Sequence, residues 1–473
     1  MTDLSPREPH RRLAWTDAVL DIQDLLLDEA DPVYIVGGAV RDALLTRPIK
    51  DVDLTTPGDS IGIARKIANH FPNGALYIMD AERGVARAII ETMHGEMHVD
   101  VARFRSDAGD LLADLLDRDF TLNAMVVDLQ GDLSLLIDPL NGERDVAASR
   151  IRRCRQGAVL SDPVRALRAV RQSSQLRFPI ETETLAEVRV AGKTLRDSVS
   201  AERVRDEFFK ILGLSKSVAA LRVLEMLDFM DDALGMERPG DDDLRRARLI
   251  AVEKMTGLLS NLLPERRGMD LASDFGFGMA LMQLNAVREQ LEDHVRHRWP
   301  NDRPHYSLLN LLALMQDTDA GIEMLADAMR LSNGEKKRLV NAAMARDWVF
   351  DIETVDDLTL HRFWHQLGDS GVDVCLLTLA NYLAGVTYRL EQDEWLVIVE
   401  RVQVLLEAYY LRYEAVVAPD PLLDGKVLIE RLGIPPGKVI GDILDAVREA
   451  QVTGEITTQE AALAFARDFA SAS

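Results

Sequence analysis

The chain has 473 residues and a formal net charge of -23 at pH 7, which excludes a surface that is basic throughout. Its composition, 47% hydrophobic and 28% charged, excludes general disorder and allows two to four domains. Because it has no apolar run of about 18 residues, no apolar signal core and only two distant cysteines, we expect a cytoplasmic protein with no membrane partner.

The first predicted elements surround a pair of glycines. Residues 13–29 have helical spacing and predict a leading helix. Residues 34–36 are β-branched or aromatic and run into Gly37 and Gly38, after which residues 39–45 have helical composition. Glycines let a backbone approach a ligand, and the exposed N–H groups of a new helix favour phosphate. The pattern predicts a phosphate-handling turn between a strand and a helix.

Two aspartates follow in a predicted strand, as Asp51-Val52-Asp53. Because strand side chains alternate between faces, both carboxylates point the same way. Like charges side by side are unfavourable unless a cation lies between them, and hard oxygen ligands suit Mg²⁺. The pair predicts a magnesium site, and a solvated edge strand is the alternative.

The glycine turn and the aspartate pair resemble a known signature, on the residues Gly37-Gly38-x-x-Arg41-Asp42 and Asp51-x-Asp53. It is that of the class II tRNA nucleotidyltransferase and bacterial poly(A) polymerase family, in the DNA polymerase β superfamily. The resemblance implies an α/β nucleotidyltransferase head, with a small mixed sheet and helices, followed by an all-α neck, body and tail. The expected bounds are 1–30 for the leading helix, 31–150 for the head, 151–225 for the base-recognition neck, 226–410 for an HD-like body without its His-Asp pair, and 411–473 for the tail.

Three strands are predicted at 75–79, 86–91 and 97–102, after a helix at 60–70. Asp100 lies on the polar face of the last strand, in the run Asp100-Val-Ala-Arg-Phe-Arg105. It resembles the third active-site carboxylate of the family, which implies that it helps to bind the metal beside the attacking hydroxyl. A polar solvent face is the alternative.

The segment around Arg118 and Asp119 resembles the family's second motif. The resemblance implies that Asp119 accepts a hydrogen bond from the ribose 2′-hydroxyl, that Arg118 lies near phosphate and that Asn123 fixes the loop. Arg41, with the glycine turn, is expected to cradle phosphates. Asp117 stands where the family has an arginine, which leaves one positive charge fewer near the nucleotide.

Residues 144–177 contain nine arginines and two acids. In so acidic a chain this contrast predicts a local basic patch for nucleic acid. A solvated, arginine-rich face is the alternative.

A helix is predicted from residue 161, with Ser161 as its cap. Asp162 and Arg165 lie one turn apart and resemble the family pair that binds the base of the incoming nucleotide; Arg168 and Arg171 follow on the same helix. One carboxylate and one guanidinium can satisfy C and A while leaving buried groups unpaired against G and U. Ser161 replaces the usual glutamate, and an ordinary helix-start ion pair is the alternative.

Two departures from the family bear on activity. Only residues 106–116 lie between Arg105 and Asp117, where family members that complete CCA carry a longer segment, so the chain resembles members that add only CC; a trimmed loop is the alternative. In the body, Gln316 precedes Asp317 in place of a metal-binding histidine, which predicts no hydrolase activity.

These residues together predict a template-independent enzyme. It would add CMP, with AMP as an open second nucleotide, from CTP or ATP to the 3′ end of tRNA, by two-metal phosphoryl transfer that releases pyrophosphate. Poly(A) polymerase is the nearest alternative, and a non-catalytic RNA-binding relative is the alternative of another class; no protein partner is inferred. The expected catalytic residues are Asp51, Asp53 and Asp100, the first two binding Mg²⁺, and the expected nucleotide-binding residues are Gly37, Gly38, Arg41, Arg118, Asp119, Asn123, Asp162, Arg165, Arg168 and Arg171.

Overall fold

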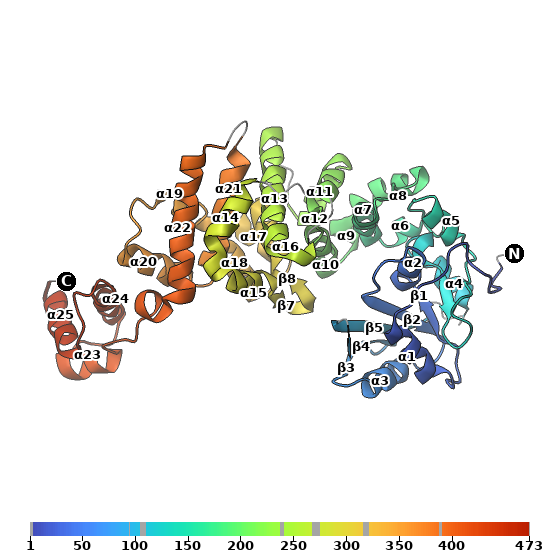
Figure 1. Cartoon of the computed structure of the whole chain (residues 1–473), viewed down its shortest axis with the longest axis horizontal. Coiled ribbons are helices and arrows are strands. Elements are labelled where there is room, and N and C mark those ends of the chain that lie inside the picture. Colours follow the sequence, from blue (N-terminus) through green and yellow to red (C-terminus); the bar gives the residue numbers. More distant parts are fainter. Residues whose placement is uncertain are drawn as a thin grey trace. The chain divides into compact units, whose positions relative to one another are not determined.

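The computed structural model describes residues 3–93, 95–104, 110–236, 241–266, 275–315, 321–386 and 390–472. The chain divides into two compact units (Figure 1). The first unit comprises Met1–Ser200 with Leu227–Phe229, and the second comprises Ala201–Met226 with Met230–Ser473. The domain bounds expected from the sequence stay predictions.

The first unit is built on a six-stranded sheet in the order β3-β4-β5-β2-β1-β6. Strands β2 and β5 pair in parallel and the other neighbours are antiparallel, so the predicted small mixed sheet is confirmed. Alternate residues of β5 are buried, as the polar and apolar alternation requires. The strands are β1 Tyr34–Val36, β2 Asp51–Thr56, β3 Ala75–Asp80, β4 Val85–Thr92, β5 Gly95–Arg103 and β6 Val126–Asp128.

Helices pack on this sheet and extend beyond it (Figure 1). Helix α3 packs against β3, β4 and β5, while α2 packs against β1 and β2. Buried Ile63 and Ile67 of α3 lie four residues apart, the spacing of one helix face. The helices are α1 Asp17–Leu26, α2 Gly38–Leu44, α3 Ser60–His70, α4 Leu111–Leu116, α5 Gly142–Ala147, α6 Ala158–Ser161, α7 Val164–Leu176, α8 Thr182–Gly192 and α9 Leu195–Ser198.

The predicted helix cap at Ser161 is wrong. Ser161 is the last residue of α6, and its hydroxyl donates to the Ala158 carbonyl at 2.9 Å. Asp162 is extended, with φ -145°, and Pro163 takes the N-cap position of α7 without a side-chain cap. Helix α6 ends and α7 begins at this point, so the Ser161 hydroxyl donates to a preceding carbonyl and does not accept from an N–H group of α7.

The second unit is helical apart from one two-stranded sheet among its described residues, which confirms the predicted helical region after the head. Helix α13 packs against both α16 and α21. The elements are α10 Ala201–Leu212, α11 Ser217–Met226, α12 Met230–Leu234, α13 Asp242–Leu262, α14 Phe275–Gln283, α15 Arg288–Arg296, β7 Arg298–Trp299, β8 Arg303–Pro304, α16 His305–Met315, α17 Ile322–Ala328, α18 Asn333–Met344, α19 Trp348–Asp351, α20 Asp357–Leu367, α21 Ser370–Gly385, α22 Gln392–Leu411, α23 Gly425–Leu432, α24 Lys438–Val452 and α25 Gln459–Ala472.

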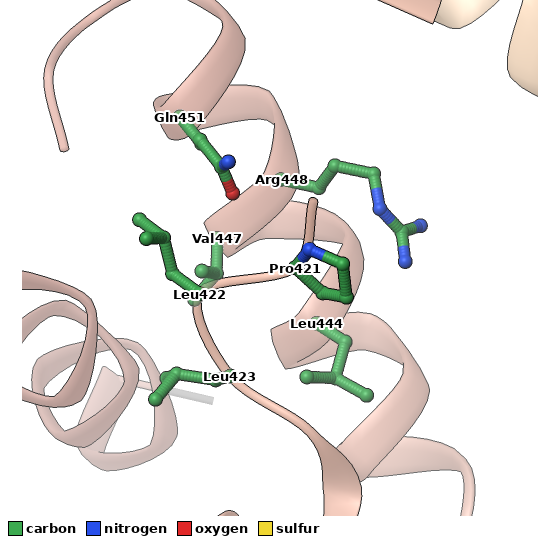
Figure 2. A pocket seen from close by; sticks show the side chains of 7 residues that line it. All are labelled: Pro421, Leu422, Leu423, Leu444, Val447, Arg448 and Gln451. Carbon is green, nitrogen blue, oxygen red and sulfur yellow. The ribbon is translucent and has the colours of Figure 1, made fainter. Parts of the chain in front are cut away.

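The last three helices share a core of their own, centred on Leu428, Ile443 and Ala462. A small pocket lies between the segment before α23 and helix α24 (Figure 2). Its lining is apolar except for Arg448 and Gln451, and no carboxylate or histidine of the described chain lines it. The pocket therefore offers no acid, base or metal ligand.

Among the helices that the structure describes, none combines the length and the apolar character needed to span a bilayer.

Candidate active site

The glycine turn and the aspartate strand meet in the head. Strands β1 and β2 pair so that Val36 lies opposite Asp53, which brings the next residue, Gly37, against the Asp53 side chain. A Cβ atom on Gly37 would lie 2.8 Å from Asp53 Oδ2, and Gly37 has φ +80°. Only glycine meets both demands without strain. The turn and the carboxylate, which the sequence joined only by resemblance, are in contact.

A row of charged side chains crosses three strands of the sheet. The register of β2 with β5 places Asp53 opposite Asp100, and the register of β5 with β4 places Asp100 opposite Arg87. Side chains at opposed positions lie on the same face. Arg87 donates through Nε to Asp100 Oδ1 at 2.7 Å and through Nη2 to Asp100 Oδ2 at 2.9 Å. Both oxygens of the third carboxylate are therefore engaged by one guanidinium.

The aspartate pair carries negative charge that the head compensates only in part. Burial raises the pKa of Asp53, and the Asp100 carboxylate raises it further, while the Arg118 guanidinium partly offsets both. Asp51 is more open, with 71% of its side chain exposed, and its Oδ1 lies 3.7 Å from His98 Nδ1. A carboxylate pair whose charge is unfavourable by itself is a suitable donor set for a hard divalent cation.

The three carboxylates do not converge on one point. Among the described residues, ligand atoms within 4.8 Å of one another occur in one group of three, which lies in the second unit. Asp100 faces Arg87 instead of joining Asp51 and Asp53. The residues that fit a metal directly are thus the two aspartates of β2.

Asp119 lies at the centre of a hydrogen-bond network. Its Oδ1 accepts from the Phe120 N–H at 2.8 Å and from Asn123 Nδ2 at 3.1 Å, and its Oδ2 accepts from Arg168 Nε at 2.8 Å. Burial alone would raise the pKa of Asp119, but Arg168 and Asn123 outweigh it, so that the pKa lies below its ordinary value. The carboxylate is ionised and can only accept hydrogen bonds.

Arg41 lies in the same network and not in an open phosphate cradle. It is buried, donates through Nε and Nη2 to the two oxygens of Asp42, each at 2.9 Å, and donates through Nη1 to Asn123 Oδ1 at 2.8 Å. A phosphate would have to displace these bonds. In this structure Arg41 links the turn after β1 to the Asp119 loop.

The expected base-reading pair is only loosely joined. Arg165 Nε lies 3.8 Å from Asp162 Oδ2, which is beyond hydrogen-bond range. The Nη groups of Arg165 donate to the carbonyl oxygens of Ala158 at 2.9 Å and Asp117 at 2.6 Å. Arg165 is buried and ties α6 to the segment before Asp119.

The remaining expected contacts lie on neighbouring elements. Arg118 donates to Asp114 at 3.0 Å and 3.1 Å, and Asp114 is fully buried. Arg171 is half-buried on α7 and donates to Gln175 Oε1 at 3.3 Å. Asp117, which stands where the family has an arginine, forms an ion pair with Arg155 at 3.4 Å.

Most arginines of the predicted basic patch at 144–177 are paired with acids, and its role in nucleic-acid binding stays a prediction. Six of the nine form ion pairs within the first unit, because acids from outside the segment and the segment's own two acids face them. The pairs are Arg150 and Arg152 with Asp145, Arg153 with Glu183, Arg155 with Asp117, Arg165 with Asp162, and Arg168 with Asp119. Counting charges along the sequence missed Glu183, which follows the segment.

Sequence reasoning also missed Arg87. The signal was present: Arg87 is the one charged residue between two alanines of a strand that is otherwise apolar until Glu91. What the sequence did not provide was its partner, because that depends on strand register.

A second polar cluster lies in the body, at His294, His305 and Asp373. Both imidazole Nε2 atoms lie 2.8 Å from Asp373 Oδ1, and Arg338 Nε donates to Asp373 Oδ2 at 2.7 Å. Trp299 Nε1 donates to His305 Nδ1 at 3.0 Å. Because Nδ1 must then lack a proton, Nε2 carries it and faces Asp373 as a donor, so it has no lone pair for a metal. The Arg338 guanidinium supplies the cation, and this cluster does not fit a metal. Gln316 and Asp317, on which the predicted lack of hydrolase activity rests, lie outside the described residues.

Comparison with known proteins shows which domains and enzymes this chain resembles. Residues 33–152 match the model of the poly A polymerase head domain, residues 177–234 that of the probable RNA and SrmB-binding site of polymerase A, and residues 389–466 that of a putative tRNA nucleotidyltransferase domain 2. A CC-adding tRNA nucleotidyltransferase of Geobacter sulfurreducens is 29% identical over 95% of both chains. An A-adding tRNA nucleotidyltransferase of Deinococcus radiodurans is 29% identical over 92% of this chain and 95% of its own. A CCA-adding enzyme in its apo form I has the same fold, with a TM-score of 0.58 and 20% identity over 95% of this chain and 92% of its own.

The mixed sheet, the aspartate pair against the glycine turn and the matched head domain define a nucleotidyltransferase. Enzymes of this class typically use a divalent metal. The chain carries a head domain like that of poly A polymerase and a tRNA nucleotidyltransferase domain, and its relatives include CC-adding and A-adding tRNA nucleotidyltransferases.

Proposed function

We propose that this chain transfers CMP from CTP to the 3′ end of tRNA and stops after the C residues. The observation that carries the proposal is the contact between Asp53 and Gly37, beside Asp51, in a chain that aligns over 95% of its length with a CC-adding relative. We include in the proposal that Mg²⁺ is the cofactor and that the protein acts in the cytoplasm.

Asp51 and Asp53 would hold the metal. When bound, Mg²⁺ lowers the pKa of the primer hydroxyl and stabilises the charge of the leaving pyrophosphate. The raised pKa of Asp53 supports this role, because a cation removes the penalty on its ionised form. The turn at Gly37 and Gly38 lets the triphosphate approach the backbone.

The remaining residues would position the nucleotide. Asp119 accepts from the ribose 2′-hydroxyl, held in place by Asn123 and Arg168. Asp162, whose side chain is 26% exposed, accepts from the exocyclic amine of the base. Arg165 holds the adjacent backbone and presents its Nε side to the base from a fixed position. Arg118 adds positive charge beside Asp53 and the phosphates, and Arg171 extends the same helix face towards the nucleotide.

The preference for CC over CCA rests on sequence. Residues 106–109, which form the first part of the shortened segment, lie outside the described residues. The specific observation for a second candidate, A-addition or poly(A) synthesis, is the A-adding relative at the same 29% identity.

An incorporation assay separates these functions. Purified full-length protein is given tRNA transcripts that end before CCA, after C and after CC, each with CTP, ATP, UTP or GTP alone and together, and the products are sequenced. We expect two C residues on the first transcript, one on the second and none on the third. Addition of A to the third transcript would show CCA-addition or A-addition, and long A tails would show a poly(A) polymerase.

The alternative of a non-catalytic RNA-binding relative is tested with variants. Asp51→Ala with Asp53→Ala removes the metal donors, and Asp80→Asn on β3 is the matched control, a carboxylate at the far edge of the same sheet. We expect the double variant to lose all incorporation and to fail to replace the wild-type gene, whereas the control keeps incorporation and replaces that gene. A double variant that supports growth as well as the wild type would favour the non-catalytic function.

A further inference from the structure

Arg87 holds the third carboxylate of the head by a two-point contact. The guanidinium donates one bond to each oxygen of Asp100, at 2.7 Å and 2.9 Å, so it faces the carboxylate edge to edge. The two residues are opposed in register on β4 and β5, which fixes their backbones relative to each other. The register of β4 with β5 therefore fixes this contact.

The contact faces the aspartate pair. Asp53 is the next residue in the same row of opposed positions, on β2. A metal ion bound by Asp51 and Asp53 would lie beside Asp100, which is already paired with the Arg87 guanidinium. With both oxygens of Asp100 bonded to Arg87, the metal can gain this third ligand only by breaking at least one of the two bonds.

We propose that Arg87 is a positioning residue that competes with the divalent metal for Asp100 and so sets how tightly the site binds its metal. The inference rests on the proposed function of the aspartate pair. Arg87 offsets part of the repulsion between Asp53 and Asp100 when no metal is bound, and it is displaced, at least in part, when the metal binds. A structural ion pair that merely stabilises the sheet would have no effect on metal binding.

The competition can be measured without any reaction. Mn²⁺ binding to the full-length protein is titrated by electron paramagnetic resonance of the free ion, with Mg²⁺ added in competition. Arg87→Gln removes the guanidinium, and Arg87→Lys keeps the charge but cannot hold both oxygens. Arg83→Gln is the matched control, because Arg83 lies on the turn before β4 with 84% of its side chain exposed.

We expect Arg87→Gln to tighten Mn²⁺ binding roughly two- to fivefold, the range of a partly exposed ion pair. Arg87→Lys should tighten it less, and Arg83→Gln should leave it unchanged. The decisive measurement is the same change made in an Asp100→Asn background. There Arg87→Gln should alter Mn²⁺ binding no more than Arg83→Gln does, because its target is gone.

Two results would overturn the inference. If Arg87→Gln binds Mn²⁺ like the wild type, or tightens binding equally with and without Asp100, Arg87 does not act through that carboxylate. The proposed function fails separately: if Asp51→Asn with Asp53→Asn binds Mn²⁺ as well as the wild type does, the metal is not at this site at all.

Discussion

The head and the body each gather groups that can bind a metal, yet their charges are balanced in opposite ways. In the head, burial and the neighbouring Asp100 raise the pKa of Asp53. In the body, burial alone would raise the pKa of Asp373, but His305 and Arg338 outweigh it and hold the pKa well below its ordinary value. The positive charge near the head carboxylate does not outweigh its burial, whereas the positive charge near the body carboxylate does.

The difference separates a site that suits a metal from one that is closed to it. Burial makes the ionised form of a carboxylate unfavourable, so a cation that binds beside a buried carboxylate stabilises that form. Asp373 already accepts from His305 and from the Arg338 guanidinium, so a metal would have to expel Arg338 and reverse the tautomer of His305. Proximity of ligand atoms, which is closer in the body, is therefore a poorer guide than charge balance.

The largest effect is expected in the head. Asp53→Asn should lower CMP incorporation by roughly 10³-fold or more, since it removes a charged metal donor. The variant should be no less stable than the wild type without metal. The pKa of Asp53 is raised in the folded chain, so the folded chain holds this proton more tightly than the unfolded chain does. The free energy of unfolding of the wild type therefore falls as the pH rises above 3.8. Asparagine does not ionise, so the variant avoids this loss of stability.

This prediction is checked by single-nucleotide incorporation and by thermal unfolding at several pH values. A variant that keeps wild-type activity would remove the distinction between the two clusters. A variant that unfolds would show that Asp53 is a structural residue.

The next effect is expected in the body. Asp373→Ala removes the buried carboxylate that accepts from Arg338 and should destabilise the second unit by about 3–5 kcal/mol, with no change in Mn²⁺ binding. Urea unfolding is followed by tryptophan fluorescence in a Trp15→Phe background, where every remaining tryptophan lies in the second unit. The control, Asp373→Leu with Arg338→Met, removes both charges and should cost less. A metal that stabilises the wild-type second unit would contradict the closed cluster.

A smaller effect should follow from adding metal. At about 100 times its dissociation constant, Mn²⁺ should stabilise the head by about 2.7 kcal/mol, and removing it with a chelator should reverse the gain. Hydrogen exchange of the β2 and β5 amides reports this directly, with Asp53→Asn as the control. Equal protection of amides in α16 and α21 would show that the metal also binds the body.

The smallest effect concerns pH. Burial lowers the pKa of His305 below 6.5, and the Asp373 carboxylate offsets this only in part. Because the unfolded chain then binds a proton more readily, stability of the second unit should fall as pH drops below 6.5, by at most about 1.4 kcal/mol per pH unit. Asp373 contributes in a different window, since its lowered pKa affects stability only below 3.8. In the His305→Gln variant, the stability of the second unit should depend less on pH between about 5 and 6.5, as measured by the same fluorescence assay.

Local pattern in the sequence was enough for several elements of the head, but not for α4, β6 or α5. The predicted strands at 75–79, 86–91 and 97–102 and the helix at 60–70 correspond to β3, β4, β5 and α3. Side-chain alternation also placed Asp100 on the polar face. These features follow from backbone periodicity, which a short stretch of chain carries by itself.

The partners of the charged side chains were decided by the tertiary structure. Strand register put Arg87 opposite Asp100, and the fold turned Arg41 to Asn123 and Arg165 to the carbonyl oxygens of Ala158 and Asp117. In the same way, the chain brought Trp299, His305 and Asp373 together across helices.

The sequence by itself therefore determined the strands and helices around the aspartate pair, that Asp51 and Asp53 share a face, and the resemblance to tRNA nucleotidyltransferases. Only the folded chain decided which acids keep their charge unpaired and which are neutralised. The reason is physical: periodicity is a property of neighbours along the chain, whereas the partner of a long charged side chain depends on contacts between segments far apart in sequence.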